Sequence, residues 1–104
     1  MVSYNHVILT GKVAKAPLRH TRPDGSPVIQ FPLELNHQEA SKQEKKSRID
    51  IVAIGKLAES EPSLFLTGQH LLVQGRLQQR RWKTAEGRDL SRIEVIATDF
   101  RKVE

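Results

Sequence analysis

The residues best suited to bind a ligand lie together in the C-terminal part of the chain, around its single tryptophan. Trp82 stands between Arg81 and Lys83, with Arg80 just before them and Arg88 a short way beyond. A flat aromatic ring can stack on an unpaired base, and nearby cations can neutralise the phosphates of a nucleic acid. These residue types at this spacing therefore indicate binding of a single-stranded nucleic acid. The competing interpretation is that the tryptophan packs across a hairpin while the cations form a solvated strand edge.

A second concentration of positive charge lies in the polar stretch 37–48, and its cations are Lys42, Lys45, Lys46 and Arg48. Because the stretch is polar throughout, we expect a long flexible hairpin loop, and basic loops of this kind can fold around phosphates. The two basic stretches, 42–48 and 76–92, hold ten of the 17 Lys and Arg residues, so the net charge of +5 is concentrated. Such charge favours an anionic partner, which could be nucleic acid, a membrane surface or an acidic protein.

Other kinds of chemistry find little support in the sequence. The chain has no cysteine and its four histidines have no metal-ligand spacing, so we expect no metal site. It contains no phosphate-binding glycine loop, serine elbow or marked pair of carboxylates, and we therefore predict neither an enzyme nor a cofactor. The N-terminus lacks a secretory signal and no apolar run is long enough to span a membrane. We accordingly expect a soluble cytoplasmic protein without a membrane partner.

The elements that must position these residues are strands. Alternation of apolar and polar residues predicts strands in five segments, at about 7–13, 29–35, 49–54, 69–81 and 89–100. The Pro-Asp-Gly sequence within 22–27 predicts a hairpin turn ahead of the second strand. The segment 56–67 has room for one or two helical turns at most, because Pro62 interrupts it. In the third strand, Asp50 is expected to face solvent or a cation such as Arg48.

Five strands with a short helical insert between the third and the fourth is the element order of an all-β OB-fold barrel. Gly11 and Gly75 stand at inward positions in the first and fourth strands, where a small barrel must bend sharply and glycine permits a bulge. The length allows one modest core, so we predict a single OB-fold nucleic-acid-binding domain over residues 1–104. The alternative is an open five-stranded sheet or a sandwich. In the OB-fold, the loops after the first and fourth strands flank the usual binding channel, which agrees with the placement of charge.

One family carries this pattern of residues. Residues 75–89, GRLQQRRWKTAEGRD, resemble the hairpin of bacterial single-stranded DNA-binding proteins, in which G-x-L-x-x-R-x-W precedes a turn containing glycine. Residues 5–13, NHVILTGKV, are similar to the opening strand of that family, and residues 55–58, GKLA, to its strand-to-helix junction. The resemblance spans nearly the whole chain, and it implies an OB-fold that binds single-stranded DNA.

Within this family, the chain most resembles the small dimeric OB-fold proteins of bacterial replication restart. Their pattern is similar to residues 9–13 (LTGKV), 16–20 (APLRH) and 25–31 (GSPVIQF). The long acidic C-terminal region of the larger members is not expected here, because the sequence stops at 100–104, FRKVE. The resemblance implies a homodimer that binds single-stranded DNA without sequence preference in the replication restart primosome. It also implies that the protein assists the restart helicase and recruits further primosome components.

Carried over by position, the resemblance implies DNA contacts at Arg19, His20, Arg81, Lys83 and Arg88. Aromatic residues that some relatives place between the second and third strands have no counterpart in 38–48. Trp82 is therefore expected to be the principal stacking residue. Three other readings stay open, namely a tailless tetrameric single-stranded DNA-binding protein, a basic adaptor that binds an acidic protein, and an RNA-binding OB domain.

Overall fold

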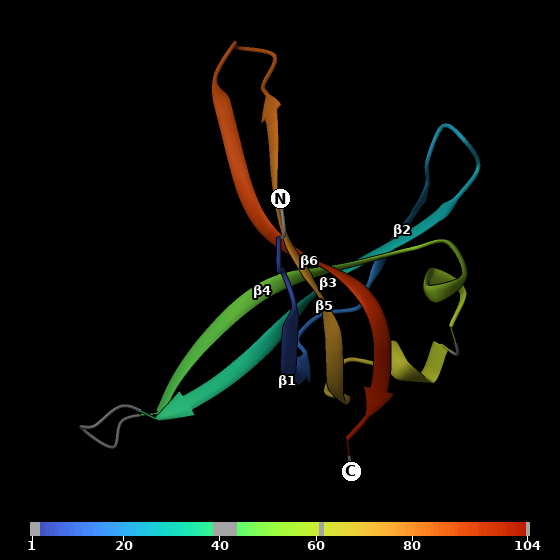
Figure 1. The fold of residues 1–104 in the computed structure, drawn as a ribbon, viewed down its shortest axis with the longest axis vertical. Coiled ribbons are helices and arrows are strands. Elements are labelled where there is room, and N and C mark those ends of the chain that lie inside the picture. The colour runs from blue at the N-terminus through green and yellow to red at the C-terminus, as the bar shows by residue number, and fades with distance from the viewer. Residues whose placement is uncertain (1–2, 39–43, 61, 104) are drawn as a thin grey trace.

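The structure is a computed structural model that describes residues 3–38, 44–60 and 62–103. Six strands and two short 3-10 helices make up the described chain (Figure 1). In chain order they are β1 (Val7–Val13), β2 (Leu18–Thr21), β3 (Pro27–Gln38), β4 (Glu44–Ile54), η1 (Gly55–Glu59), η2 (Pro62–Phe65), β5 (His70–Lys83) and β6 (Asp89–Lys102). Across the part of the chain that is described, no helix is long and apolar enough to cross a membrane.

Five of the strands form a closed ring. Their order is β1-β5-β6-β4-β3, and β3 returns to β1 through the pairs Lys12 with Glu34 and Val13 with Leu33. All neighbours are antiparallel except β4 and β6, which run parallel. The predicted all-β OB-fold is thereby confirmed, and its five predicted strands are those of the ring. The sixth strand, β2, pairs only with β3 and was not predicted; the helical insert between β4 and β5 consists of the two 3-10 helices.

Two glycines allow strands to approach one another closely within the ring. A Cβ atom on Gly11 would collide with the backbone carbonyl oxygen of Glu34, where β1 passes from β5 to β3. A Cβ atom on Gly75 would collide with the carbonyl oxygen of Ile96, and the register of β5 against β6 shifts between Gln74 and Gly75. The prediction of a bulge is confirmed at Gly75, whereas at Gly11 the structure shows a close approach of β1 to β3.

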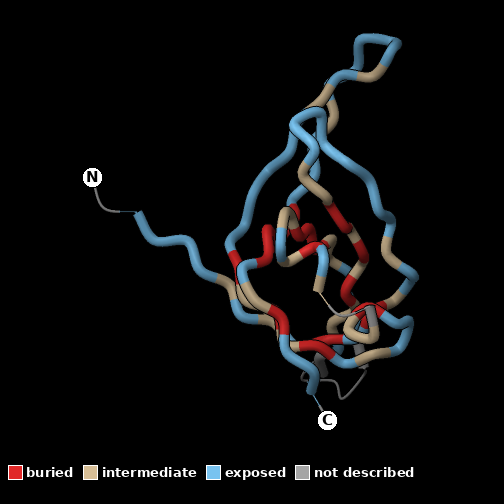
Figure 2. Tube along the Cα trace, turned by 90° about the vertical axis from the view of Figure 1, so that its right-hand side faces the viewer, coloured by how far each residue is buried: buried red, intermediate tan, exposed pale blue. Residues whose placement is uncertain are grey.

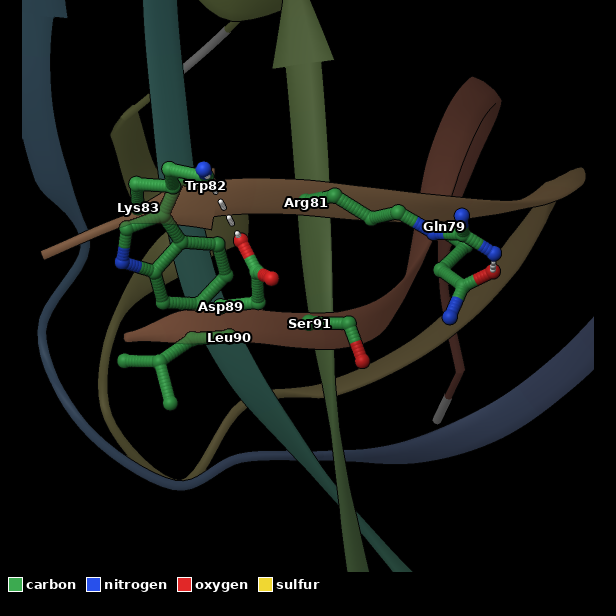
Figure 3. A pocket seen from close by; sticks show the side chains of 7 residues that line it. All are labelled: Gln79, Arg81, Trp82, Lys83, Asp89, Leu90 and Ser91. Atoms are coloured by element: carbon green, nitrogen blue, oxygen red, sulfur yellow. Dashed lines mark hydrogen bonds and ion pairs between the residues drawn. The ribbon is translucent and has the colours of Figure 1, made fainter. Parts of the chain in front are cut away.

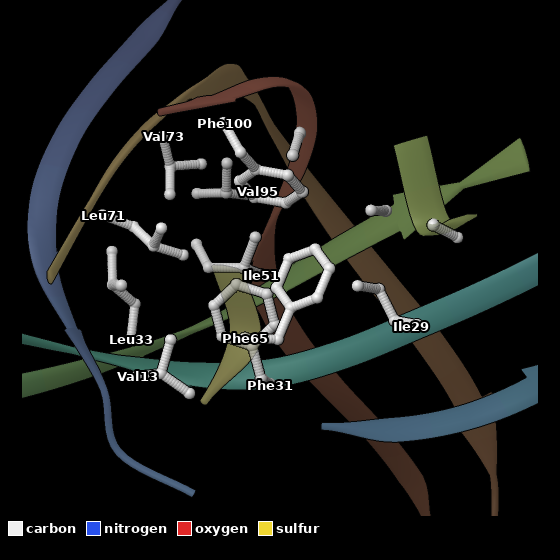
Figure 4. Packing of buried hydrophobic residues seen from close by; sticks show 13 residues of the cluster. Val13, Ile29, Phe31, Leu33, Ile51, Phe65, Leu71, Val73, Val95 and Phe100 are labelled. Carbon is white, nitrogen blue, oxygen red and sulfur yellow. The ribbon is translucent and has the colours of Figure 1, made fainter. Parts of the chain in front are cut away.

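The hydrophobic core fills the ring and stops at its rims, as the tube in Figure 2 shows by the concentration of buried residues there. Three phenylalanines from different elements meet inside it, with ring centroids 5.5 Å apart for Phe31 and Phe65 and 5.2 Å apart for Phe65 and Phe100. Around them lie Val13, Ile29, Leu33, Ile51, Leu71, Val73 and Val95 (Figure 4). Since η2 supplies Phe65, the 3-10 insert closes one end of the ring with an aromatic side chain.

Three hairpin arms project from the ring, formed by β2 with β3, β3 with β4, and β5 with β6 (Figure 1). The predicted turn in 22–27 is confirmed, because Arg22 and Ser26 are joined by a backbone hydrogen bond of 2.9 Å and Gly25 has a φ of 90°. At the tip of the β5–β6 arm, the backbone N–H of Thr84 donates to the carbonyl of Arg88 at 2.9 Å.

The expectation of a long loop over 37–48 is wrong outside residues 39–43, which the structure does not describe. β3 continues to Gln38 and β4 begins at Glu44. The polar sequence is held as strand partly by charge, because the carboxylate of Glu34 lies 3.7 Å from the ammonium of Lys46 and 3.6 Å from the guanidinium of Arg48. Opposite charges at facing and diagonal positions stabilise a two-stranded ladder.

Candidate nucleic-acid interface

The two faces of the β5–β6 arm carry different chemistry. Along an extended strand, successive side chains point to opposite faces. Arg80 and Trp82 therefore share one face of β5, while Arg81 and Lys83 share the other. Across the arm, Trp82 is paired with Leu90. The sequence placed all four basic and aromatic residues in one cluster. In the structure strand alternation directs them to opposite faces of the arm, although Trp82, Arg81 and Lys83 border one hollow there.

The indole of Trp82 has one side covered by a cation and borders a hollow in the surface of the arm. The guanidinium carbon of Arg80 lies 4.7 Å from the centroid of the ring, which is within the range of a cation–π interaction. A hollow of about 600 Å³ is lined by Trp82, Leu90 and Lys83 together with Arg81, but not by Arg80 (Figure 3). The tryptophan is half-buried, and part of its side chain borders this hollow.

Two arginines of the arm are paired with carboxylates at its base. The Nε atom of Arg80 lies 3.3 Å from Glu94 Oε1, and Glu94 is only 3% exposed. Arg92, which is paired with Arg80 across the arm, donates to Asp50 at 2.8 Å. The cation that Asp50 faces is thus Arg92 and not Arg48, because Asp50 lies beside β6 in the parallel ladder. Arg92, Glu94 and Asp50 were not predicted as parts of the site, since only the register of distant strands brings them together.

A groove runs over the outside of the ring between the β2–β3 and β5–β6 arms. Its floor is apolar, formed by the small outer cluster of Val28, Val52 and Ile96, which are each less than a tenth exposed. Polar side chains surround this floor, and those that line the groove are His20, Arg22, Gln30, Gln78, Arg80 and Glu94. The volume is about 210 Å³. An apolar floor with hydrogen-bonding walls suits a flat heterocycle such as a base, and we name this feature the outer groove. Sequence reasoning missed Arg22, Gln30 and Gln78.

Arg19 does not join the outer groove. It alternates with His20 on β2, and its guanidinium points to the 3-10 insert, with Nη1 3.5 Å from the carbonyl oxygen of Ala58. Of these two predicted DNA contacts, only His20 lines the outer groove, while both border a second hollow beside η1.

The second basic stretch is described only in part. Lys46 and Arg48 lie on β4 with more than half of each side chain exposed, and both face Glu34. Lys45 is paired with His37 in the β3–β4 ladder. The predicted contact at Lys42 lies outside the described residues.

The remaining cations of the β5–β6 arm are exposed near its tip. Arg81 donates to the side-chain carbonyl of Gln79 at 3.0 Å, and the ammonium of Lys83 lies 4.0 Å from the carboxylate of Asp89. Both partners of the second pair are largely solvated, so the pair adds little stability and leaves the lysine available to another anion. Arg88 lies in the exposed turn between the strands.

The tip of the β2–β3 arm is ordered by one carboxylate. The hydroxyl and the backbone N–H of Ser26 both donate to Asp24. These two hydrogen bonds, the first being the larger cause, hold the pKa of Asp24 below its ordinary value. The turn therefore presents Arg22 next to a carboxylate that stays ionised. Among the residues that the structure describes, no group of three His, Asp or Glu side chains could hold a metal ion.

Comparisons with known proteins agree with this architecture. Residues 4–103 match the sequence model described as "Single-strand binding protein family". Similar proteins include the single-stranded DNA-binding protein of Aquifex aeolicus, 34% identical over 103 residues that cover 95% of this chain and 69% of the relative. Single-stranded DNA-binding protein 2 of Chlorobaculum tepidum is 33% identical over 102 residues, covering 93% and 69%. The solved structure titled "Plasmodium falciparum SSB complex with ssDNA" shares the fold, with a TM-score of 0.88 at 22% identity over 100% of this chain and 98% of that one.

Proposed function

The chain belongs to the single-strand binding protein family, and on that premise we propose that it binds single-stranded DNA without sequence preference and catalyses no reaction. The observation that carries the proposal is that the half-buried Trp82 borders a hollow that Arg81 and Lys83 also line. Base stacking needs the ring, and the phosphates that accompany the base need the cations. The ring and the cations both lie on the β5–β6 arm.

The strand would be bound by two kinds of surface. Bases would stack on Trp82 beside Arg80 and enter the outer groove next to His20. We assign the neutralisation of phosphates to the basic residues of the two basic stretches and of β2, namely Arg19, Lys42, Lys45, Lys46, Arg48, Arg81, Lys83 and Arg88. Because neither surface reads the edge of a particular base through a fixed pair of donors and acceptors, the binding would tolerate any sequence.

We further propose that the chain acts as a homodimer in the replication restart primosome of the cytoplasm, in the manner of primosomal replication protein N. Support comes from the segments 16–20 and 25–31, which are similar to that protein and here form the start of β2 and the turn into β3. In this role it would assist the restart helicase and recruit further primosome components. The alternative within the family is a tetrameric single-stranded DNA-binding protein, and sedimentation of the free chain distinguishes a mass of two chains from four.

Titration with oligo-dT tests the proposed function directly. Since Trp82 is the only tryptophan, its emission reports on the stacking site without labelling. We expect saturable quenching, with an affinity that falls as salt rises and that is similar for mixed-sequence DNA. Failure to bind any oligonucleotide at low salt, together with capture of an acidic protein, would instead establish an adaptor. Competition with an RNA oligomer of the same sequence decides between DNA and RNA.

A further inference from the structure

Arg80 differs from the other cations of the β5–β6 arm because it is held from two sides. Its Nε atom lies 3.3 Å from Glu94 Oε1, and its guanidinium carbon lies 4.7 Å from the centroid of the Trp82 ring. The three residues share one face, since Arg80 and Trp82 alternate along β5 and Glu94 lies on the facing stretch of β6. The guanidinium thus contacts a carboxylate and an indole, while 46% of the Arg80 side chain stays exposed.

Glu94 cannot easily release this arginine. It is the one charged residue among the buried side chains of the described chain, and its Oε2 atom has no hydrogen-bond partner there. A buried carboxylate that loses its only cation bears an uncompensated charge, which is strongly unfavourable. Arg92, which is paired with Arg80 across the arm, is not free to replace it, because Arg92 is bound to Asp50 at 2.8 Å. The charge of Arg80 is therefore already neutralised within the fold.

We propose that Glu94 is a positioning residue of the DNA site: it fixes Arg80 against one side of the Trp82 ring, so that Arg80 orients the indole for base stacking and does not bind a phosphate. This inference rests on the proposed function. It explains why Trp82, but not Arg80, lines the hollow at the arm. The base stacks from the hollow, and Arg80 supports the ring from behind.

The proposal gives different roles in DNA binding to Arg80 and to Arg81, its neighbour in sequence. Arg81 lies on the opposite face of β5, where its only hydrogen bond among the described residues is to the neutral amide of Gln79. A neutral partner leaves the charge of Arg81 available to a phosphate. Removal of Arg81 should thus change the salt dependence of binding, whereas removal of Arg80 should change the stacking.

The experiment measures oligo-dT affinity at a series of salt concentrations, together with Trp82 quenching at saturation. For Arg80→Ala we expect binding about two- to fivefold weaker, in line with an exposed cation–π contact, with reduced quenching and an unchanged salt slope. For Arg81→Ala the slope of log affinity against log salt should flatten by about 0.7, the value for one phosphate of a single strand. Arg80→Lys keeps the charge but loses the planar stack, so it should behave as Arg80→Ala.

Glu94→Gln tests the positioning residue itself, since it keeps the shape of the side chain and frees Arg80. We expect the salt slope to steepen by about 0.7 and the quenching to change, as Arg80 leaves the ring for a phosphate. The matched control is Asp99→Asn, which removes the charge of a half-exposed carboxylate 3.3 Å from Arg101 on the same strand and should leave both readouts unchanged.

Two results overturn the inference. One is a slope for Arg80→Ala that flattens as much as for Arg81→Ala, and the other is normal quenching by Arg80→Lys. If Glu94→Gln fails to fold, the Arg80 variants decide alone. If the unaltered chain does not bind DNA, the proposed function itself is refuted. The two results above, in contrast, can be measured only on variants that still bind DNA.

Discussion

Trp82 lies directly opposite Leu90, one residue pair before the β5–β6 ladder ends at Lys83 and Asp89. The indole is therefore held by the arm and by Arg80, far along the strand from the buried part of β5 that ends at Gly75. Because the core contributes nothing to this contact, binding and folding can be altered separately.

Trp82→Ala should weaken oligo-dT binding by about 1–3 kcal/mol while leaving the melting temperature nearly unchanged, since the base loses its stacking partner and the core is intact. Anisotropy of a labelled oligonucleotide measures the affinity, and circular dichroism measures the melting temperature. Leu66→Ala serves as control, because Leu66 is an exposed apolar side chain beyond η2. If Trp82→Ala and the unaltered chain bind oligo-dT with equal affinity, the tryptophan packs across the hairpin and does not stack on a base.

Lys83→Ala and Arg88→Ala should each weaken the binding of all DNA sequences and flatten the salt slope by about 0.7, as expected for the loss of one phosphate contact. The measurement is affinity for oligo-dT and for a mixed sequence between low and moderate salt. Lys56→Ala, at an exposed position of η1, is the matched control. A slope that stays the same would remove the residue concerned from the contact surface.

Glu34→Gln should strengthen DNA binding, because it releases the two cations that the carboxylate now faces, Lys46 and Arg48. We expect a gain of about two- to fivefold at low salt and a steeper salt slope. The double variant Lys46→Ala with Arg48→Ala, made in the Glu34→Gln background, should abolish the gain. Unchanged affinity in Glu34→Gln would show that β4 does not contact the strand.

Gly75→Ala should destabilise the ring by about 1–3 kcal/mol, as an atom forced into a closed space does. Its Cβ would meet the carbonyl oxygen of Ile96, which belongs to the β6 backbone and cannot rotate away. Urea unfolding measures the loss, and Gln79→Ala on the exposed part of β5 is the control. Stability equal to that of the control would mean that the bulge can open at no cost.

Ser26→Ala should raise the pKa of Asp24 towards its ordinary value, because it removes the hydroxyl donor that lowers this pKa most. A carboxyl group whose pKa is lowered by folding stabilises the folded state above its unfolded pKa, and this contribution is lost as the pH falls through the folded pKa. As the pH falls through the pKa of Asp24 in the folded state, the unaltered chain should therefore lose more stability than the variant. Carboxyl chemical shifts of Asp24 during a pH titration give the two pKa values, and identical values would contradict the role of Ser26.

Much of the fold is evident in the sequence, because the ring strands bury one face and so alternate clearly. β2 was not predicted because it buries neither face. All four of its residues, Leu18–Thr21, are exposed, so the strand shows no alternation of buried and exposed positions. The extension of β3 and β4 into the polar stretch was also missed. It depends on which residues face each other, as Glu34 faces Arg48, and a polar sequence gives no sign of its register.

The sequence supplied candidate residues for the site but not their arrangement. Trp82 and its neighbouring cations could be named from residue type alone. Their division between two faces follows from strand alternation, and the pairing of Arg80 with Glu94 follows from a ladder whose register shifts at Gly75. Long-range register is decided by the packing of the whole ring, so local sequence could not supply it.

The ring is closed between β1 and β3 by two residue pairs, whereas β4 and β6 share three, β1 and β5 six, and β3 and β4 eleven. The first transient opening of the ring should therefore occur at this seam, where the fewest ladder contacts must part. The strands under the outer groove, β3, β4, β6 and β5, remain joined to one another when it parts. The proposed DNA-binding surface should consequently keep its shape during such an opening.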